Sequence, residues 1–343
     1  MEKFRILSID GGGLRGVVPL TILKKVEEKI APKKIWEYFD LIAGTSTGGL
    51  ITCAITLKDF QNPHLAKYSL DDIMEVYLKR GKEIFPQYNF FQRLIHKVSD
   101  ISNPAFSDKG IAKVFGDVLG EARMNDCLKP IMVSTYDLAN NLPLFFKSNE
   151  SKYDATLNAR LYDICRATSA GPTYLPSYEF DYPKNKPIEN EKRNCIDGGV
   201  YVNNPAMAAL SEFSKNHKYY LPSTEAEKDI DYRNVFVLSI GTGTYAAPIS
   251  TKESRNAGLI YWAKAISDIM MRGVNRTTDY EMGEMMIEGN YLRFNIRIDN
   301  AEHSNMSNSS EETTQYLIQA TQEQIINKPD EMKLLDEFLE KSK

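Results

Sequence analysis

A serine flanked by small residues follows a short apolar stretch in "LIAGTSTGGLI", residues 41–51. Gly44-Thr45-Ser46-Thr47-Gly48 fits the pattern G-x-S-x-G, with a predicted strand before it and a predicted helix after it. This setting is typical of a nucleophile elbow, in which the serine lies on a strained strand-to-helix turn. The alternative interpretation is a glycine-rich packing turn whose serine caps the helix.

A second glycine loop, "GGGLRG" at residues 11–16, lies between a predicted strand and a predicted helix. Backbone amides at a helix N-terminus favour an anion, which can be a phosphate or an oxyanion. The loop matches the dinucleotide pattern G-x-G-x-x-G, but Asp40 begins its strand, so the acidic residue expected at the strand's far end is missing. No G-K-[ST] follows the glycines, and Arg15 either adds positive charge or pairs with a carboxylate.

A serine nucleophile requires a base, and the chain offers few histidines for that role. His217 and His303 lie in polar settings typical of solvated loops or helix ends, and no histidine is predicted to be buried beside a glycine turn. The sequence "CIDGGVYVNNP" instead places Asp197 after a short apolar lead and before Gly198 and Gly199. A carboxylate base and an ordinary β-turn both remain open for this stretch.

Two strand–loop–helix units must position these residues. "FRILSID" (4–10) and "FDLIAG" (39–44) predict buried strands, followed by helices over 17–30 and 50–57. Further strands are predicted at 129–137, 142–148, 233–244 and 291–299, with a helix over 158–170. We therefore predict an α/β fold with a mainly parallel central sheet flanked by helices.

The domain organisation is predicted to be a single elaborated unit. Residues 1–250 form the main domain, with a helical insertion at about 58–125 that has weak strand signals. Residues 251–343 are predicted to be mostly helical and to pack on the same domain. The charged stretch 184–194 is predicted to be a solvated loop.

The composition of the 343 residues is that of a globular protein. The formal net charge of −4 gives no electrostatic reason to expect a nucleic-acid polymer as partner. We predict no secretory leader and no membrane span, and we predict four reduced cysteines (Cys53, Cys127, Cys165 and Cys195) in a cytoplasmic protein. Peripheral contact with a membrane surface stays open. No metal site is predicted, because neither cysteine–histidine clusters nor a calcium loop has the required spacing.

Three motifs in order resemble the patatin-like phospholipase family: "DGGGLRG" (10–16), "GTSTG" (44–48) and "DGG" (197–199). "ATSAGPTYLPSY" (167–178) and "VLSIGTGT" (237–244) are also similar to stretches of that family. The resemblance covers roughly residues 4–245 and implies a three-layer α/β/α fold. It leaves the region beyond 250 without a pattern.

The resemblance implies a serine–aspartate dyad that needs no cofactor. Ser46 would attack an ester carbonyl, and Asp197 would accept its proton and pass it to the leaving alcohol. The implied supporting residues are Gly12 and Gly13 for the oxyanion hole, Gly11, Arg15 and Gly16 beside it, Gly44, Thr45, Thr47 and Gly48 around the nucleophile, and Gly198 and Gly199 after the aspartate. Because an ordinary aspartate is a weak base, Asp197 is predicted to be partly desolvated and close to Ser46.

The implied substrates are phospholipids or related acyl lipids, reached through transient contact with a membrane surface. Two stretches are candidates for a lid or an interfacial surface: Phe85, Tyr88, Phe90 and Phe91, and Ile260, Trp262, Ile266 and Met270. Other functions stay open: an esterase or lysophospholipase on soluble esters, a nucleotide-binding oxidoreductase that uses the first glycine loop, or a binding module that is inactive or awaits an unknown regulatory ligand or protein.

Overall fold

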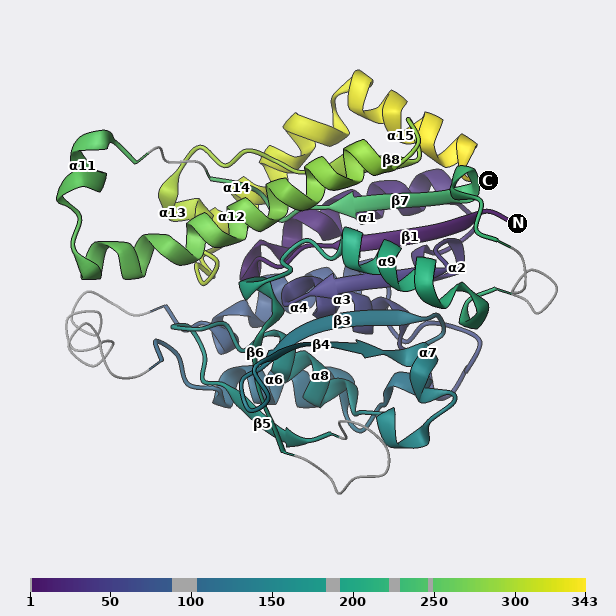
Figure 1. The fold of residues 1–343 in the computed structure, drawn as a ribbon, viewed down its shortest axis with the longest axis horizontal. Helices are drawn as coiled ribbons and strands as arrows, with labels where there is room; N and C mark the ends of the chain where they lie inside the picture. Colours follow the sequence, from purple (N-terminus) through teal and green to yellow (C-terminus); the bar gives the residue numbers. More distant parts are fainter. Residues whose placement is uncertain (1, 88–103, 183–191, 222–228, 246–248) are drawn as a thin grey trace.

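The computed structural model describes residues 2–87, 104–182, 192–221, 229–245 and 249–343 (Figure 1). A single mixed sheet occupies its centre, in the strand order β5-β6-β3-β2-β1-β7-β8, with β4 also paired to β3. The strands are β1 (Phe4–Ile9), β2 (Leu41–Thr45), β3 (Ile131–Asp137), β4 (Leu142–Lys147), β5 (Tyr178–Asp181), β6 (Lys192–Asp197), β7 (Val235–Ile240) and β8 (Tyr291–Phe294).

The strands β3, β2, β1, β7 and β8 run parallel to one another, while β4, β5 and β6 are antiparallel to their neighbours. The carboxyl ends of parallel strands meet at one edge of a sheet, where ligands bind in open α/β folds. Both glycine loops therefore lie at the same edge, because one follows β1 and the other follows β2.

Helices cover both faces of the sheet. They are α1 (Val17–Ile30), α2 (Ile35–Tyr38), α3 (Thr47–Thr56), α4 (Leu70–Ile84), α6 (Lys109–Leu119), α7 (Ser148–Ser151), α8 (Leu161–Thr168), α9 (Ala206–Asn216), α11 (Thr251–Asn256), α12 (Leu259–Met285), α13 (Ala301–Ser304), α14 (Glu311–Thr321) and α15 (Pro329–Lys341). Short 3-10 turns include η1 (Gly13–Gly16) and η4 (Gly198–Val200), and a π-helical turn spans Gln322–Ile326.

The alternation of side chains along each strand divides the core between the two faces. In β1, Leu7 and Ile9 pack with helices α1, α3, α14 and α15, whereas Phe4 and Ile6 pack against α9 and the end of α12 at Met282. A further cluster fills the space between α3, α4, α6 and α8. The result is a three-layer α/β/α arrangement, which confirms the predicted fold class.

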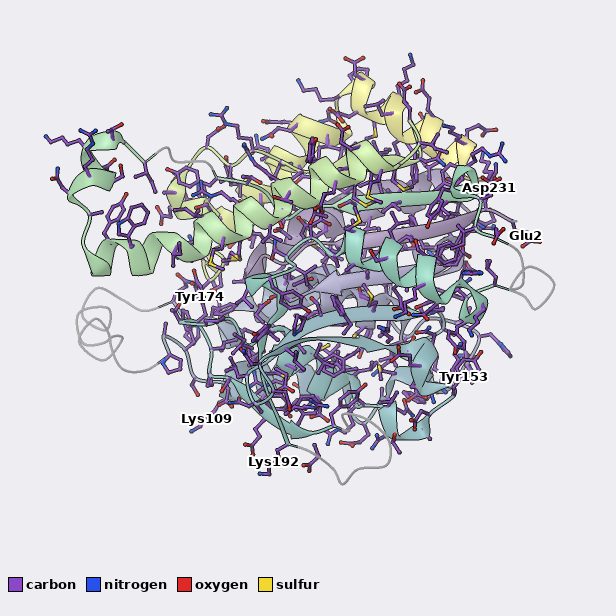
Figure 2. The ribbon with its side chains drawn as sticks, viewed as in Figure 1. Glu2, Lys109, Tyr153, Tyr174, Lys192 and Asp231 are labelled. Carbon is purple, nitrogen blue, oxygen red and sulfur yellow. The ribbon has the colours of Figure 1, made fainter. Side chains whose placement is uncertain are left out.

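The long helix α12 crosses one face of the molecule and continues beyond it, so that α11 and the first turns of α12 project from the body at the left of Figure 1. Figure 2 shows Lys109, the first residue of α6, and Tyr174 on this same side. The arrowheads of β1, β2 and β7 point toward it as well. The projecting segment and the carboxyl ends of the parallel strands therefore share one side of the molecule.

Most predicted elements are present, with small shifts of boundary. The first helix spans Val17–Ile30 as predicted, and β8 is the late strand expected within 291–299. The predicted loop over 184–194 is wrong at its end, because residues 192–194 begin β6 and pair with β5; residues 184–191 lie outside the described ranges. Helices α4 and α6 come from the segment predicted as an insertion, and both pack against neighbouring helices of the main body. The predicted domain division stays a prediction.

Candidate active site

Ser46 lies on the turn between β2 and α3, with φ 52° and ψ −122°. A non-glycine residue at positive φ is unusual, and such strain concentrates at functional sites. The surrounding structure holds the turn in place: the Ser46 amide donates to Thr168 Oγ1 at 2.8 Å, and Thr168 Oγ1 in turn donates to the Ser134 carbonyl at 2.6 Å. Ser46 caps α3 only by its position, because its side chain makes no capping hydrogen bond.

The glycines around Ser46 are required by close packing of α3 against the sheet. A Cβ on Gly44 would lie 2.2 Å from the Gly48 carbonyl oxygen. A Cβ on Gly48 would lie 2.1 Å from the Ile9 carbonyl oxygen, at the end of β1. Thr45 and Thr47 are buried beside them, with Thr45 Oγ1 bonded to the Val202 carbonyl. These four residues fix the turn that presents Ser46.

Asp197 reaches the same place from β6. Thr45 at the end of β2 pairs with Ser134 of β3, and the next residue of β3, Thr135, pairs with Asp197. Ser46 and Asp197 therefore lie at the ends of β2 and β6, the two strands that flank β3. Two ordinary strand spacings put their backbones about 10 Å apart. Their side chains bridge much of that gap, because the Ser46 hydroxyl is near enough to the Asp197 carboxyl to lower its pKa.

The environment of Asp197 makes its carboxyl an unusually strong base. Burial raises its pKa to about 6, although hydrogen bonds from Ser46 and from the Gly199 amide act in the opposite direction. The Gly199 amide lies 2.7 Å from Asp197 Oδ1. Asp197 is half-buried, so its desolvation is incomplete. The effect of burial on the pKa nevertheless outweighs that of both partners. The role of Asp197 as the base for Ser46 stays a prediction.

The two glycines after Asp197 are constrained as well. A Cβ on Gly198 would lie 2.3 Å from Ser134 Oγ, and one on Gly199 would lie 3.0 Å from Asn203 Oδ1. Gly198 can thus be replaced only with movement of β3. Glycine at this position lets the turn after Asp197 lie directly on the strand that separates it from Ser46.

The first glycine loop presents two backbone amides without partners. Among the described residues, neither the Gly12 nor the Gly13 amide donates a hydrogen bond, whereas the Gly11 amide donates to the Asn203 carbonyl at 3.1 Å. Gly13 lies in the left-handed region at φ +58°, and it lines the same cavity as Ser46. An ideal Cβ on Gly11 would lie 3.2 Å from Ser46 Cβ, so the loop touches the nucleophile elbow.

The carbonyl groups of this loop accept hydrogen bonds from protein donors, on the side opposite to the two amides. The Gly11 carbonyl accepts from Thr242 Oγ1 at 2.7 Å, and the Gly12 carbonyl accepts from the Arg15 amide and from Arg15 Nε. In a trans peptide the next N–H points away from the carbonyl. These contacts therefore turn the amides of Gly12 and Gly13 away from the protein partners that hold the loop. Gly16 lies farther along, against the ring of Tyr77.

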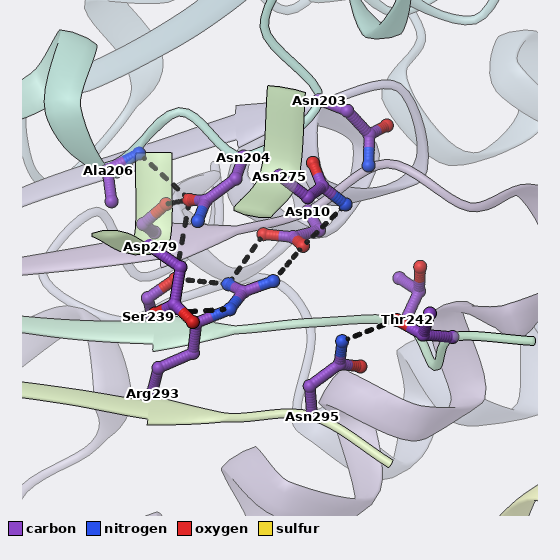
Figure 3. A network of polar contacts seen from close by, with 12 residues as sticks. Asp10, Asn203, Asn204, Ala206, Ser239, Thr242, Asn275, Asp279, Arg293 and Asn295 are labelled. Carbon is purple, nitrogen blue, oxygen red and sulfur yellow. Dashed lines mark hydrogen bonds and ion pairs between the residues drawn. The ribbon is translucent and has the colours of Figure 1, made fainter. Parts of the chain in front are cut away.

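A buried ion pair between Asp10 and Arg293 holds the residue that precedes the first glycine loop (Figure 3). Arg293 of β8 lies 2.6 Å from Asp10 Oδ2 and 3.2 Å from Oδ1, and it also donates to Ser239 Oγ. Burial raises the pKa of the Asp10 carboxyl, and Arg293 opposes that rise. Asn275 of α12 reaches the same carboxyl at 3.5 Å. Residues beyond 250 thus hold Asp10, which directly precedes Gly11.

Sequence reasoning did not identify Arg293 or Thr168 as parts of this site. Thr242 lies in the stretch "VLSIGTGT", which was a visible signal, but nothing in the linear sequence links Arg293 to Asp10 across 283 positions. The loop backbone is also fixed by Met306, whose carbonyl accepts from the Leu14 amide at 2.9 Å. The C-terminal region therefore contributes contacts that its composition did not predict.

The three described histidines do not line the cavity that contains Ser46. They are His64, His217 and His303, and His96 lies outside the described residues. His303 lies in the last turn of α13, one of the two settings predicted for it, but it is buried, stacks on Tyr316 and bonds Thr313.

Three further predictions concern the cysteines, a metal site and membrane-spanning helices. The four cysteines are free, three buried and Cys127 half-buried, as predicted. Across the described ranges no group of three or more His, Cys, Asp or Glu side chains is arranged to hold a metal ion. None of the described helices combines the length and apolar character that a membrane crossing requires.

The candidate lid residues fall into three groups: one is buried, three are exposed, and the others lie outside the described residues. Phe85 is buried, contacts Phe106 and lines the cavity with Ser46, so it is not part of an exposed surface. Trp262, Ile266 and Met270 are exposed on α12. Tyr88, Phe90 and Phe91, and the side chain of Ile260, lie outside the described residues.

The order of the motifs and the three-layer α/β/α fold are those of a family of lipid acyl hydrolases. The family model described as patatin-like phospholipase matches residues 7–210, and the chain belongs to this family. Membership supports the function of a lipid acyl hydrolase in general.

Individual relatives extend the likeness over nearly the whole chain. Patatin-like protein 2 of Oryza sativa subsp. indica is 31% identical over 339 residues, covering 90% of this chain and 82% of the relative. Patatin-2-Kuras 4 of Solanum tuberosum is 31% identical over 343 residues, with 96% and 87% covered. Among solved structures, VipD from Legionella pneumophila matches with a TM-score of 0.42 at 15% identity, over 98% of this chain and 67% of that one.

Proposed function

We propose that the protein is a lipid acyl hydrolase of the phospholipase A type, with Ser46 as nucleophile and Asp197 as base. The observation that supports this most strongly is the closeness of a strained, buried serine to a carboxyl whose pKa is raised to about 6. Burial without a charged partner keeps Asp197 basic, yet at neutral pH it is still mostly ionised.

The mechanism follows from the contacts around Ser46. Asp197 removes the hydroxyl proton as Ser46 Oγ attacks the ester carbonyl, giving a tetrahedral intermediate. The protonated Asp197 then gives its proton to the leaving alcohol, and the acyl group stays on Ser46. Water, deprotonated by the same carboxylate, attacks the acyl-enzyme, and the returning proton regenerates Ser46 and releases the fatty acid.

The amides of Gly12 and Gly13 are proposed to bind the oxyanion of that intermediate. Both lack protein partners among the described residues and are held by contacts to their carbonyl sides. Such donors cost no reorganisation during the reaction, and each is worth about 3–4 kcal/mol in serine hydrolases. Arg15 supports the loop by binding the Gly12 and Gly243 carbonyls.

Phospholipids or related acyl lipids are the proposed substrates, and a lipid surface is the proposed partner. Trp262, Ile266 and Met270 recur at intervals of four residues along α12, which places them on one helix face, and their exposed fractions are 36%, 45% and 49%. This helix begins in the projecting segment on the side of the molecule where the parallel strands end (Figure 1). Apolar side chains on such a helix can enter the headgroup region of a bilayer.

The other functions are less well supported. An apolar cavity beside Ser46 favours an acyl chain over the polar phosphates of a nucleotide. Hydrolysis of soluble esters or lysolipids remains within the same chemistry and is separated from phospholipase activity by the substrate assay below. An activator-dependent enzyme would have the same residues but no basal activity.

The test is release of fatty acid from mixed phospholipid vesicles in the presence of EDTA. Wild type is expected to release fatty acid, and Ser46→Ala and Asp197→Asn are each expected to lose at least a thousandfold in rate. Ser107→Ala, the same kind of change at an exposed serine, serves as the matched control. Full activity in Ser46→Ala would refute the nucleophile assignment. Cleavage of soluble esters alone would favour the esterase.

A further inference from the structure

The cavity beside Ser46 continues away from the catalytic groups, between three helices. Its volume is about 100 Å³, well above the roughly 10–15 Å³ that one water needs. Leu50 and Ala54 of α3 form one wall. The other walls are formed by α4 and α6, mainly through Ile73, Val76, Tyr77, Ile84, Ile111, Val114, Phe115 and Val118. We refer to this space as the helix chamber.

The helix chamber follows the axis of α3. Ser46, Leu50 and Ala54 are four residues apart, so they lie on one face of the helix. Near its beginning, the Tyr77 hydroxyl of α4 bonds Thr47. Near its end, the Lys67 amide before α4 bonds the Leu57 carbonyl at 2.8 Å. The two helices are thus antiparallel, and the chamber extends from Ser46 toward the segment that precedes α4.

Tyr68 lies at the far end of the chamber. Its hydroxyl donates to the Val118 carbonyl at 2.7 Å and so joins the segment before α4 to the end of α6. Asp72, the charged residue among those that line the space, accepts from the Ser69 amide at 2.8 Å and from Ser69 Oγ at 2.6 Å. Its carboxylate is therefore used in capping α4. The length between Ser46 and Tyr68 is lined almost wholly by apolar side chains.

The end of the chamber next to Ser46 is polar. Ser169 lies beside Ser46 in the lining, and its Oγ is buried with no hydrogen-bond partner among the described residues. A buried hydroxyl without a partner costs free energy unless a ligand satisfies it. Polar groups at one end and apolar walls along the rest fit an amphiphile with its carboxyl group at Ser46 and its hydrocarbon tail toward Tyr68.

The length of the chamber gives the length of that tail. From Ser46 to Ala54 the helix rises about 12 Å, and from Ser46 to Leu57 about 16 Å, at 1.5 Å per residue. Carbon–carbon bonds of about 1.5 Å at tetrahedral angles advance roughly 1.25 Å per methylene. An extended chain therefore reaches Ala54 after about ten carbons and the level of Leu57, beside the segment that carries Tyr68, after about thirteen.

We propose that the helix chamber binds one unbranched acyl chain with its carbonyl at Ser46, and that Ala54 and the Tyr68–Val118 contact set the chain length that the protein accepts. The proposal rests on the proposed function, because it assigns the acyl side of the same substrate. It adds a length limit and names the residues that impose it.

The test measures binding separately from hydrolysis. Saturated fatty acids of six to eighteen carbons, below their critical micelle concentrations, compete with a fluorescent fatty acid for the Ser46→Ala variant. Affinity is expected to rise about fourfold per methylene and to level off near thirteen carbons. Affinity that does not depend on length, or that rises without a limit, would overturn the proposal.

Two variants test which residues set the chain-length limit. Ala54→Leu is expected to move the plateau down to about ten carbons, while Val118→Ala moves it to longer chains. Ala112→Leu on α6 is the matched control, since Ala112 does not line the chamber. If Ala54→Leu fails to fold, the opposite shift in Val118→Ala still tests the proposal. An unchanged plateau in both variants refutes it.

Hydrolysis of monomeric esters of the same chain lengths by wild type separates the two claims. Length-dependent binding without hydrolysis of any ester would leave the chamber assignment intact and reject the proposed function. Hydrolysis with equal kcat/KM for all lengths would support the proposed function and reject the chamber as the acyl site.

Discussion

The raised pKa of Asp197 predicts a distinctive acid limb in the pH dependence of hydrolysis. Only the ionised carboxylate can accept the Ser46 proton, and the pKa is about 6 because burial outweighs the hydrogen bonds to Ser46 and Gly199. On a soluble ester, kcat/KM should therefore fall tenfold per pH unit below about 6, reaching about a tenth of its plateau at pH 5. An aspartate at its ordinary pKa would retain more than about nine-tenths at pH 5.

The same shift predicts how stability depends on pH. An acid whose folded pKa lies above its unfolded value destabilises the folded state wherever it is ionised, and this cost disappears below the unfolded pKa of 3.8. A difference of about 2.2 pKa units corresponds to about 3 kcal/mol at pH 7. Asp197→Asn should therefore be inactive yet more stable than wild type by up to about 3 kcal/mol at pH 7, with the difference falling to about 0.6 kcal/mol at pH 4.

Two measurements check this reasoning: the pH profile of kcat/KM between pH 4 and 8, and urea unfolding of wild type and Asp197→Asn at pH 4 and 7. Asp181→Asn, the same chemical change at an exposed position of β5, is the matched control and should leave both unchanged. An acid limb near pH 4, or equal stability of wild type and Asp197→Asn at pH 7, would refute the claim that Asp197 is desolvated.

Other predictions concern the loop and the lipid surface. Arg293→Met leaves the buried Asp10 carboxyl without its partner, so the free energy of unfolding should fall by about 3–5 kcal/mol; a loss below about 1 kcal/mol in urea unfolding would contradict the role of the pair. Gly12→Ala places a Cβ 2.1 Å from Thr242 Oγ1, so kcat should fall at least a hundredfold while fatty-acid binding persists; unchanged kcat would rule out this loop as the oxyanion site. Trp262→Ser should weaken co-sedimentation with phospholipid vesicles about tenfold without changing hydrolysis of monomeric esters; equal co-sedimentation would exclude α12 as the contact.

Local sequence determined most of the elements because their signals are short in range. The apolar stripe of residues 17–30 predicts α1, since a period near 3.6 buries one helix face whatever the neighbour is. The glycines at 44 and 48 similarly predict a tight turn around Ser46, and the structure supplies the reason in the carbonyl oxygens that a Cβ would meet.

Signals were missing where pairing decides the structure. The short β5 was not predicted, and β6 was predicted only as an apolar lead before Asp197. Lys192 and Asn194 have charged or polar side chains that resemble a loop, but β5 provides backbone hydrogen bonds to this segment. Strand propensity depends on such neighbours more than on the residue itself.

The sequence by itself determined the α/β class, the two glycine loops, the nucleophile candidate Ser46 and the carboxylate candidate Asp197. These depend on residue types and spacings within a few positions of each other. Tertiary structure alone decided that Ser46 and Asp197 lie at the ends of the two strands that flank β3, how far burial raises the pKa of Asp197, that Arg293 holds Asp10 from 283 positions away, and that three helices line an apolar chamber. Distances and burial between remote segments arise only when the sheet order and the packing of helices on it are fixed, which no local pattern specifies.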